Sequence, residues 1–279
     1  MKLVALGLGA IVVLGSGLGL AACGSSSSPA PGGVDASDAA LDADGPFQFD
    51  SGPRDAQPEA AAPVFCKGLT VDFCNESSGP TPGAGWDGVD ARGGGAVSLV
   101  AATETSKPFA LKSTLPAITT GSNAANAQVA KKIALAGKKK ITISLAANIG
   151  TAAPSAGATV TYFYVLVDGG GISLGRRDTE WFVRVSRKNA AGDDGAEPVL
   201  TTAPPLSKWT RMKLEIVLGN PSGSLKLDVD GAQALVQTLA THGDAQPLTE
   251  ATLAVGLTHG TGATPAMEAL VDDVTFDLE

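Results

Sequence analysis

Few residues in this sequence have side chains that commonly take part in catalysis. Only two histidines occur, His242 and His259, and both lie in segments rich in turn-forming residues. The sequence contains no H-E-x-x-H, G-x-S-x-G or C-x-x-C motif, so it offers no pattern typical of a zinc protease, a serine hydrolase or a thiol redox site. We therefore predict that both histidines lie on the surface and that the protein is not an enzyme.

Aromatic residues are the candidates for ligand contacts. Tyr162, Tyr164, Trp181 and Phe182 lie in two predicted strands, at 159–167 and 180–188. Sugar recognition combines aromatic faces with polar groups, so these four side chains predict a glycan-binding surface. Aromatic residues make up only 5% of the chain, so the alternative is that the rings fill the core.

Two adjacent carboxylates near the C-terminus, Asp272 and Asp273, predict a bound cation. Successive strand residues point to opposite faces, so Asp272 would share the core-facing side of Val274 and Phe276. A carboxylate that leaves water must be compensated. Calcium is one solution, with backbone carbonyls and Asp72 completing the site. The alternative is compensation by backbone amides or by a lysine or arginine.

The spacing of apolar residues predicts that these groups lie on strands. Segments 140–147, 212–218 and 224–236 alternate with period two, and the last contains an Asp-Gly hairpin signal. Segment 159–167 is apolar on both faces, as expected of a central strand. Further strands are predicted at 97–101, 180–188, 252–258 and 270–278. No helical stripe is present, so the predicted fold class is an all-β, two-sheet antiparallel sandwich.

The N-terminal segment has one charge, Lys2, followed by an apolar stretch with small residues at its end. This pattern is typical of a secretory signal rather than of a membrane span. The sequence Leu-Ala-Ala-Cys at 20–23 resembles the lipobox of bacterial lipoproteins. The resemblance implies that residues 1–22 are removed and that Cys23 is acylated. The lipid would anchor the protein in the cell envelope, at the outer membrane. An ordinary secretion signal that ends near a cysteine is the alternative.

Residues 23–63 are predicted to be a disordered, lipid-anchored acidic linker. They are rich in Ser, Pro, Gly, Ala and Asp and hold too little apolar surface to offset the entropy of ordering. This composition resembles the linkers of myxobacterial lipoproteins. Residues 64–279 are then one folded domain, of a length common for a β-sandwich. The net charge of −8 and the absence of a basic patch exclude nucleic acid as a partner.

Two cysteines, Cys66 and Cys74, remain once Cys23 is assigned to the anchor. An even pair in an exported protein is typical of a disulfide, which we predict here. A metal site is the alternative, although no histidine lies nearby and two thiolates make a poor zinc set.

Short motifs at both ends of the domain form a recognisable frame. They are VDFCNESSG at 71–79, Trp86, GGGAVSL at 93–99 and LVDDVTFDLE at 270–279. The frame resembles the concanavalin A-like, laminin-G-like jelly-roll domain of many myxobacterial lipoproteins. The resemblance implies a jelly roll whose first and last strands lie close together. Glucanases of this fold carry E-x-D-x-x-E or E-x-D-x-E on one strand, and neither motif occurs here.

The sequence therefore predicts a non-catalytic, membrane-anchored envelope lipoprotein whose sandwich binds glycans or surface proteins. One alternative is a passive structural or adhesive module without a specific small ligand. The other is a glycan-active hydrolase, for which the carboxylate motif is missing. A groove lined by exposed rings would favour glycan binding, and a flat polar face would favour the passive module.

Overall fold

The computed structural model describes residues 65–279, apart from 103–104, 107, 120–124, 169, 190–191 and 245–246. The predicted signal peptide (1–22), the predicted anchor Cys23 and the predicted linker (23–63) lie outside the described residues. The described residues form fifteen strands and no helix. They accordingly contain no helix that is long and apolar enough to cross a membrane.

The strands, in chain order, are β1 (Phe73–Asn75), β2 (Gly88–Arg92), β3 (Ala96–Ala101), β4 (Phe109–Leu115), β5 (Asn126–Ala134), β6 (Lys140–Ile149), β7 (Thr159–Val167), β8 (Gly170–Arg177), β9 (Glu180–Asn189), β10 (Gly192–Ala196), β11 (Trp209–Val217), β12 (Gly223–Val229), β13 (Ala232–Leu239), β14 (Glu250–Thr261) and β15 (Met267–Leu278).

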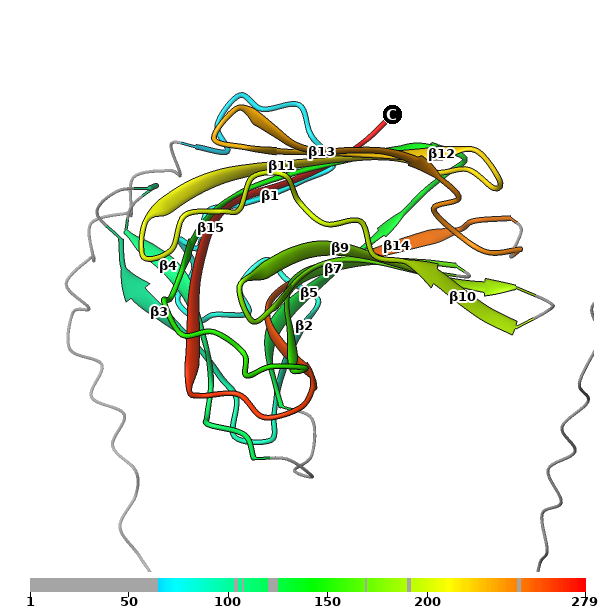
Figure 1. Ribbon diagram of the computed structural model, residues 1–279. Helices are drawn as coiled ribbons and strands as arrows, with labels where there is room; N and C mark the ends of the chain where they lie inside the picture. The colour runs from blue at the N-terminus through cyan, green and yellow to red at the C-terminus, as the bar shows by residue number, and fades with distance from the viewer. Residues whose placement is uncertain are drawn as a thin grey trace, which may run out of the picture. The chain divides into compact units, whose positions relative to one another are not determined.

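These strands form two antiparallel sheets that pack face to face (Figure 1). The eight-stranded sheet has the order β13-β12-β11-β6-β15-β4-β3, with β1 also paired to β15, and it lies on the outside of the curve in Figure 1. The seven-stranded sheet has the order β10-β9-β8-β7-β14-β5-β2 and lies on the inside. The predicted all-β jelly-roll sandwich is confirmed.

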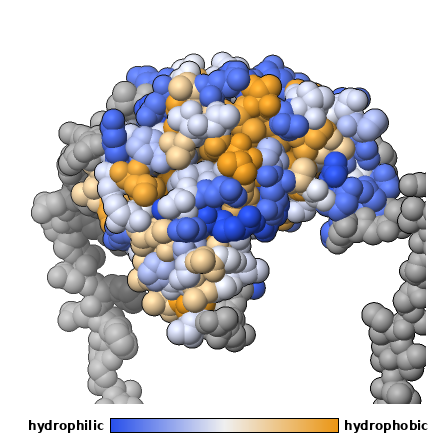
Figure 2. Space-filling view, viewed as in Figure 1, coloured by the Kyte–Doolittle hydropathy of each residue, from blue (hydrophilic) through white to orange (hydrophobic). Residues whose placement is uncertain are grey.

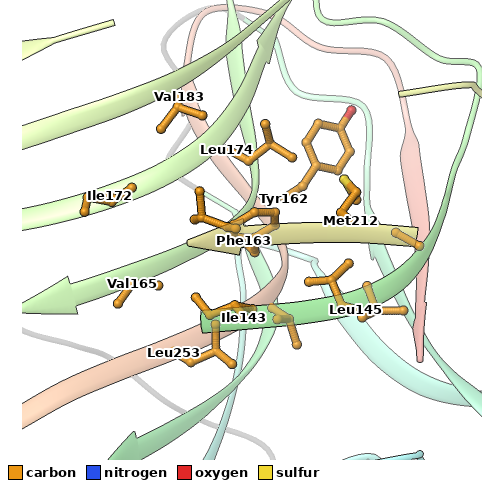
Figure 3. Packing of buried hydrophobic residues seen from close by; sticks show 14 of the residues in the cluster. Ile143, Leu145, Tyr162, Phe163, Val165, Ile172, Leu174, Val183, Met212 and Leu253 are labelled. Carbon is orange, nitrogen blue, oxygen red and sulfur yellow. The ribbon is translucent and has the colours of Figure 1, made fainter. Parts of the chain in front are cut away.

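Alternating apolar residues hold the two sheets together. On β6, Ile141, Ile143 and Leu145 are buried, and they pair in register with Ile216, Leu214 and Met212 of β11. Residues of one sheet meet residues of the other in this core, where Leu145 and Met212 pack near Tyr162 and Phe163 (Figure 3). Burying each large apolar side chain contributes about 1.5–3 kcal/mol, so the alternation seen in the sequence decides which face of each strand points inward.

The first and last strands lie side by side, as the resemblance implied. Phe73 of β1 pairs with Phe276 of β15. The predicted disulfide between Cys66 and Cys74 is confirmed, with a Cα–Cα distance of 5.8 Å. The Glu76 carboxylate accepts hydrogen bonds from the backbone N–H groups of Phe65 and Cys66, at the start of the disulfide loop, at 2.9 and 3.1 Å. Together these contacts tie the start of the folded chain to its C-terminal strand.

Candidate functional site

A hollow lies on the open, inward-curved face of the seven-stranded sheet. Its volume is about 460 Å³, and strands β7, β8 and β9 supply most of its walls. Gly170 and Gly171 contribute to it, and a side chain at Gly171 would press against Leu166, another residue of the lining. The space-filling view shows the molecule notched on the underside of this sheet (Figure 2). A hollow that runs across several strands can hold an extended chain such as a glycan.

Polar side chains gather beside this hollow on the same face of the sheet. They come from four adjacent strands, β2, β5, β14 and β7. The antiparallel pairing of these strands places their outward-facing residues next to one another. We call this set the polar cluster. Its members are Asp90, Arg92, Asn126, Gln128, Tyr164 and Thr258.

Gln128 is the centre of the polar cluster. Its side-chain Nε2 donates to the phenol oxygen of Tyr164 at 3.0 Å and more weakly to the Asp90 carboxylate at 3.4 Å. Its Oε1 accepts a hydrogen bond from the Thr258 hydroxyl at 2.7 Å. Gln128 is only 6% exposed, so these partners hold it in a fixed position. The Tyr164 phenol is half-buried and lines the hollow.

Asp90 and Arg92 form the charged side of the polar cluster. The guanidinium donates two hydrogen bonds to the carboxylate, at 2.6 and 2.7 Å, and Asn126 donates a third at 2.9 Å. The hydrogen bond from Arg92 holds the pKa of Asp90 below its ordinary value, against the opposing effect of burial. The pKa of Arg92 is raised, chiefly by its hydrogen bond to Asp90, with a smaller contribution from Tyr164. Both groups are therefore charged at neutral pH.

The structure separates the four aromatic candidates. Tyr162 and Trp181 lie in the core with ring centroids 4.9 Å apart, and burial raises the pKa of Tyr162 to about 12. Phe182 is 1% exposed, with the guanidinium groups of Arg177 and Arg184 over its ring at 5.1 and 5.4 Å. Of the four, Tyr164 alone lines the hollow. Tyr162 and Trp181 fill the core, which is the alternative that the sequence left open, whereas Phe182 is buried beneath the two arginines and does not belong to the core cluster.

The two carboxylates near the C-terminus are both buried, with 0% of Asp272 and 2% of Asp273 exposed. Their side chains do not point to opposite faces, because a bulge interrupts the register after Asp272 and Asp273 has a φ of 52°. The Ser106 hydroxyl donates to both carboxylates, and Arg211 pairs with Asp273 at 2.9 Å. Asp72 instead accepts a hydrogen bond from the backbone N–H of Leu278 at 2.7 Å.

No group of three or more His, Cys, Asp or Glu side chains within the described ranges is arranged to hold a metal ion. A calcium ion at Asp272 and Asp273 would thus depend on backbone carbonyls and hydroxyls for most of its ligands. The ion pair between Asp273 and Arg211 matches the alternative to calcium, in which an arginine compensates the buried carboxylate. The calcium site stays a prediction.

The expectation that the histidines lie on the surface is wrong. His242 and His259 are 4% and 6% exposed. His242 lies in a loop and His259 on strand β14, and each ring contacts a nearby backbone carbonyl, that of Gly243 at 2.7 Å and that of Gly262 at 2.6 Å. Neither histidine lines the hollow.

Five members of the polar cluster were not predicted from the sequence. Asp90 and Arg92 alternate with Val89 and Ala91, and Asn126 and Gln128 flank Ala127. Alternation of this kind marks one polar face of a strand. It could have singled out these segments, but it does not tell which strands become neighbours.

Comparisons with known proteins agree with the fold. No protein-family model matches the sequence, and no curated protein was found with a similar sequence. The endo-β-1,4-glucuronan lyase of the fungus Trichoderma reesei has a similar structure, with a TM-score of 0.61 and 19% identity over 75% of this chain and 96% of its own. The alginate lyase from Klebsiella pneumoniae gives a TM-score of 0.45 at 8% identity, over 65% and 84% of the two chains. A glycoside hydrolase family 16 endo-glucanase from Bacteroides ovatus gives 0.43 at 11%, over 64% and 84%.

These comparisons correct the prediction that the protein is a non-catalytic binding module. The glucuronan lyase with this fold is an enzyme, so the fold favours the glycan-active alternative over the non-catalytic module. At 19% identity the similarity establishes the fold and not the reaction. The reaction has to be argued from the side chains of this chain.

Proposed function

We propose that this protein is a polysaccharide lyase that cleaves a uronate-containing glycan by β-elimination. The observation that carries the proposal is the Tyr164 phenol, which lines the hollow and accepts a hydrogen bond from Gln128, the residue that also contacts the Asp90 partner of Arg92. A proton-transfer group at an open hollow, with a cation in the same cluster of side chains, is an arrangement suited to proton abstraction next to a carboxylate.

The side chains around the hollow favour elimination over hydrolysis. Glycoside hydrolases generally use two carboxyl groups on either side of the scissile bond. None of the described residues that line the hollow is Asp or Glu. Asp90, in the polar cluster, has both oxygens engaged by Arg92. Elimination needs no pair of carboxyl groups, since it needs only one group able to take and return a proton.

The proposed reaction balances without water. Tyr164, reacting as its phenolate, takes the proton from C5 of a uronate residue, the bond between C4 and O4 breaks, and a double bond forms between C4 and C5. The same oxygen then returns the proton to O4 of the leaving chain. General acid–base catalysis of this kind contributes typically about 10²–10⁴-fold to a rate.

Arg92 supplies the positive charge that this chemistry needs. Removing the C5 proton places negative charge on the adjacent carboxylate, and a guanidinium stabilises such charge. The Arg92 side chain is 69% exposed, and its Nη1 atom takes no part in the pair with Asp90. Arg92 can therefore bind a substrate carboxylate while Asp90 holds it in place.

The test is to incubate the purified protein with β-1,4-glucuronan, alginate and polygalacturonate. Elimination creates an unsaturated uronate at the new chain end, which absorbs in the ultraviolet. We expect absorbance and reducing ends to appear together on at least one polyuronate. Reducing ends without absorbance would identify a hydrolase instead, and neither signal on any glycan would reject the proposal.

The chain provides a matched pair of variants, because it has only two tyrosines. We expect Tyr164→Phe to lower kcat by about 100-fold or more, since it removes the proton-transfer group. Tyr162→Phe should keep nearly full activity, because the Tyr162 side chain is buried in the core and does not line the hollow. Equal activity of the two variants would contradict the role of Tyr164.

The proposal includes the location of the enzyme. Acylated Cys23 would anchor it to the outer membrane, and residues 23–63 would connect the anchor to the folded domain. The lipobox-like sequence at 20–23 supports this part. If Cys23→Ala stays in the membrane fraction as before, this part is wrong.

A further inference from the structure

Thr258 contacts the central residue of the polar cluster, Gln128, and also lines the hollow. It lies on β14 and pairs across the sheet with Asn126 of β5 and Thr161 of β7. Its hydroxyl donates to Gln128 Oε1 at 2.7 Å, the shortest of the hydrogen bonds that Gln128 makes. Thr258 also lines the hollow, so one residue contacts both the hollow and the group that holds Tyr164.

The orientation of the Gln128 amide decides what Tyr164 can do. An amide side chain has a carbonyl oxygen that accepts and an NH₂ group that donates. With Thr258 donating to Oε1, the NH₂ group faces Asp90 and Tyr164. The Tyr164 oxygen then accepts from Gln128 both before and after it takes the C5 proton, and the proton it has taken is free to point into the hollow toward O4.

The opposite orientation of the amide would not serve the reaction. It would set Oε1 against the Asp90 carboxylate, which Arg92 keeps charged, and two acceptors would face each other. The same amide oxygen would accept the Tyr164 proton and remove it from the reacting position. Thr258 favours the orientation in which the Gln128 NH₂ group faces Asp90 and Tyr164, because its hydroxyl donates to Oε1 on the opposite side of the amide.

We propose that Thr258 is a positioning residue that sets the orientation of Gln128 and, through it, the proton of Tyr164. This inference rests on the proposed elimination reaction. It predicts a defect in the chemical step rather than in substrate binding, because Thr258 acts through Gln128.

The experiment compares three variants of the full chain. Thr258→Val removes the hydroxyl at nearly constant size, and Thr258→Ser keeps it. Thr252→Val is the matched control, since Thr252 is a half-buried threonine on β14 that pairs with Lys132 and Leu166, away from the polar cluster. On the preferred polyuronate we expect Thr258→Val to lower kcat about tenfold with KM unchanged, the loss of one oriented hydrogen bond. Thr258→Ser should restore kcat to within about threefold, and Thr252→Val should match the parent.

Three kinetic results would overturn the inference. These are an unchanged kcat in Thr258→Val, a rise in KM at constant kcat, or a serine variant as slow as the valine variant. A purely structural role would lower the melting temperature of Thr258→Val and leave the kcat of the folded fraction unchanged.

A second readout does not depend on activity. The Gln128 side-chain NH₂ signals in a ¹H–¹⁵N spectrum can be assigned from their disappearance in Gln128→Ala. We expect Thr258→Val to shift these signals and Thr252→Val to leave them in place. If the parent forms no unsaturated product, the proposed function fails, while a shift in this spectrum still shows that Thr258 orients Gln128. Unmoved signals would overturn the inference even if the enzyme is a lyase.

Discussion

Single residues set the chemistry of this protein through their hydrogen-bond partners. Tyr162 and Tyr164 differ by two positions, yet one is buried in the core and the other lines the hollow. Asp90 and Asp272 likewise have different surroundings, which shift their pKa values in opposite directions. The Arg92 guanidinium lowers the pKa of Asp90, whereas burial raises the pKa of Asp272 to about 6, with one carboxylate oxygen left without a partner in the described part of the chain. Two identical side chains therefore act differently because of their surroundings.

The raised pKa of Asp272 predicts a pH dependence of stability. The folded state holds this proton up to about pH 6, whereas the unfolded chain releases it near 3.8. The folded state thus binds more protons between these values, and its stability falls as the pH rises through them. Two pKa units correspond to ~3 kcal/mol. In a chelating buffer, Asp272→Asn should raise the free energy of unfolding at pH 8 relative to the parent and show little difference at pH 4, as measured by urea titration. An equal effect at both pH values would contradict this origin.

The calcium prediction concerns the same pair of carboxylates and is tested separately. A bound cation would compensate Asp272 and Asp273, so calcium at about 100 times its dissociation constant should add about 2.7 kcal/mol to stability at pH 8. That corresponds to a rise of several degrees in the melting temperature of a domain of this size. The rise should be absent in Asp272→Asn. An unchanged melting temperature in the parent would show that Arg211 and Ser106 compensate the pair without a metal ion.

At the scale of the elements, the strands place the polar cluster by register. Asp90 pairs with Gln128, and Asn126 pairs with Thr258. These residues are 38 and 132 positions apart in the chain, and only the antiparallel order β7-β14-β5-β2 makes them neighbours. An irregularity between Thr161 and Phe163 then turns Tyr164 toward the open face, with Tyr162 and Phe163 both buried before it.

The strands themselves were accessible to sequence reasoning. The segments 140–147 and 212–218 alternate cleanly and became β6 and β11. Segment 159–167 was also recognised as a strand, but it is apolar on both faces, so its period does not tell which tyrosine points outward. The bulge at Asp272 similarly broke the alternation on which the calcium argument depended. The polar cluster was missed because it is assembled from four strands whose order is a long-range property of the fold.

At the scale of the whole molecule, charge becomes important. The hollow lies on the inward-curved sheet, and Arg92 is the exposed cation of the polar cluster. The chain nevertheless has a net charge of −8, and residues 24–63 alone carry seven acidic residues against one basic residue. A polyuronate is itself a polyanion. The predicted acidic linker should therefore repel the polyuronate that the polar cluster attracts. The positions of the charges along the chain should then influence the apparent affinity of the protein for the polyuronate.

If the proposed lyase activity holds, this repulsion leads to a prediction for the full-length protein. A variant of unchanged length, with the seven acidic residues of 24–63 replaced by Asn or Gln, should have a several-fold lower KM on polyuronate at about 10 mM ionic strength, where charges interact over about 30 Å. At about 1 M salt that range falls to about 3 Å, so parent and variant should converge. The kcat should be the same in both, because the linker takes no part in the chemical step. Replacing seven serine, alanine or glycine residues of the same segment with Asn or Gln is the matched control, which should behave like the parent at every salt concentration. If the neutralised variant keeps the parent KM at low salt, the linker does not affect the approach of the substrate, and the charges close to the hollow alone govern binding.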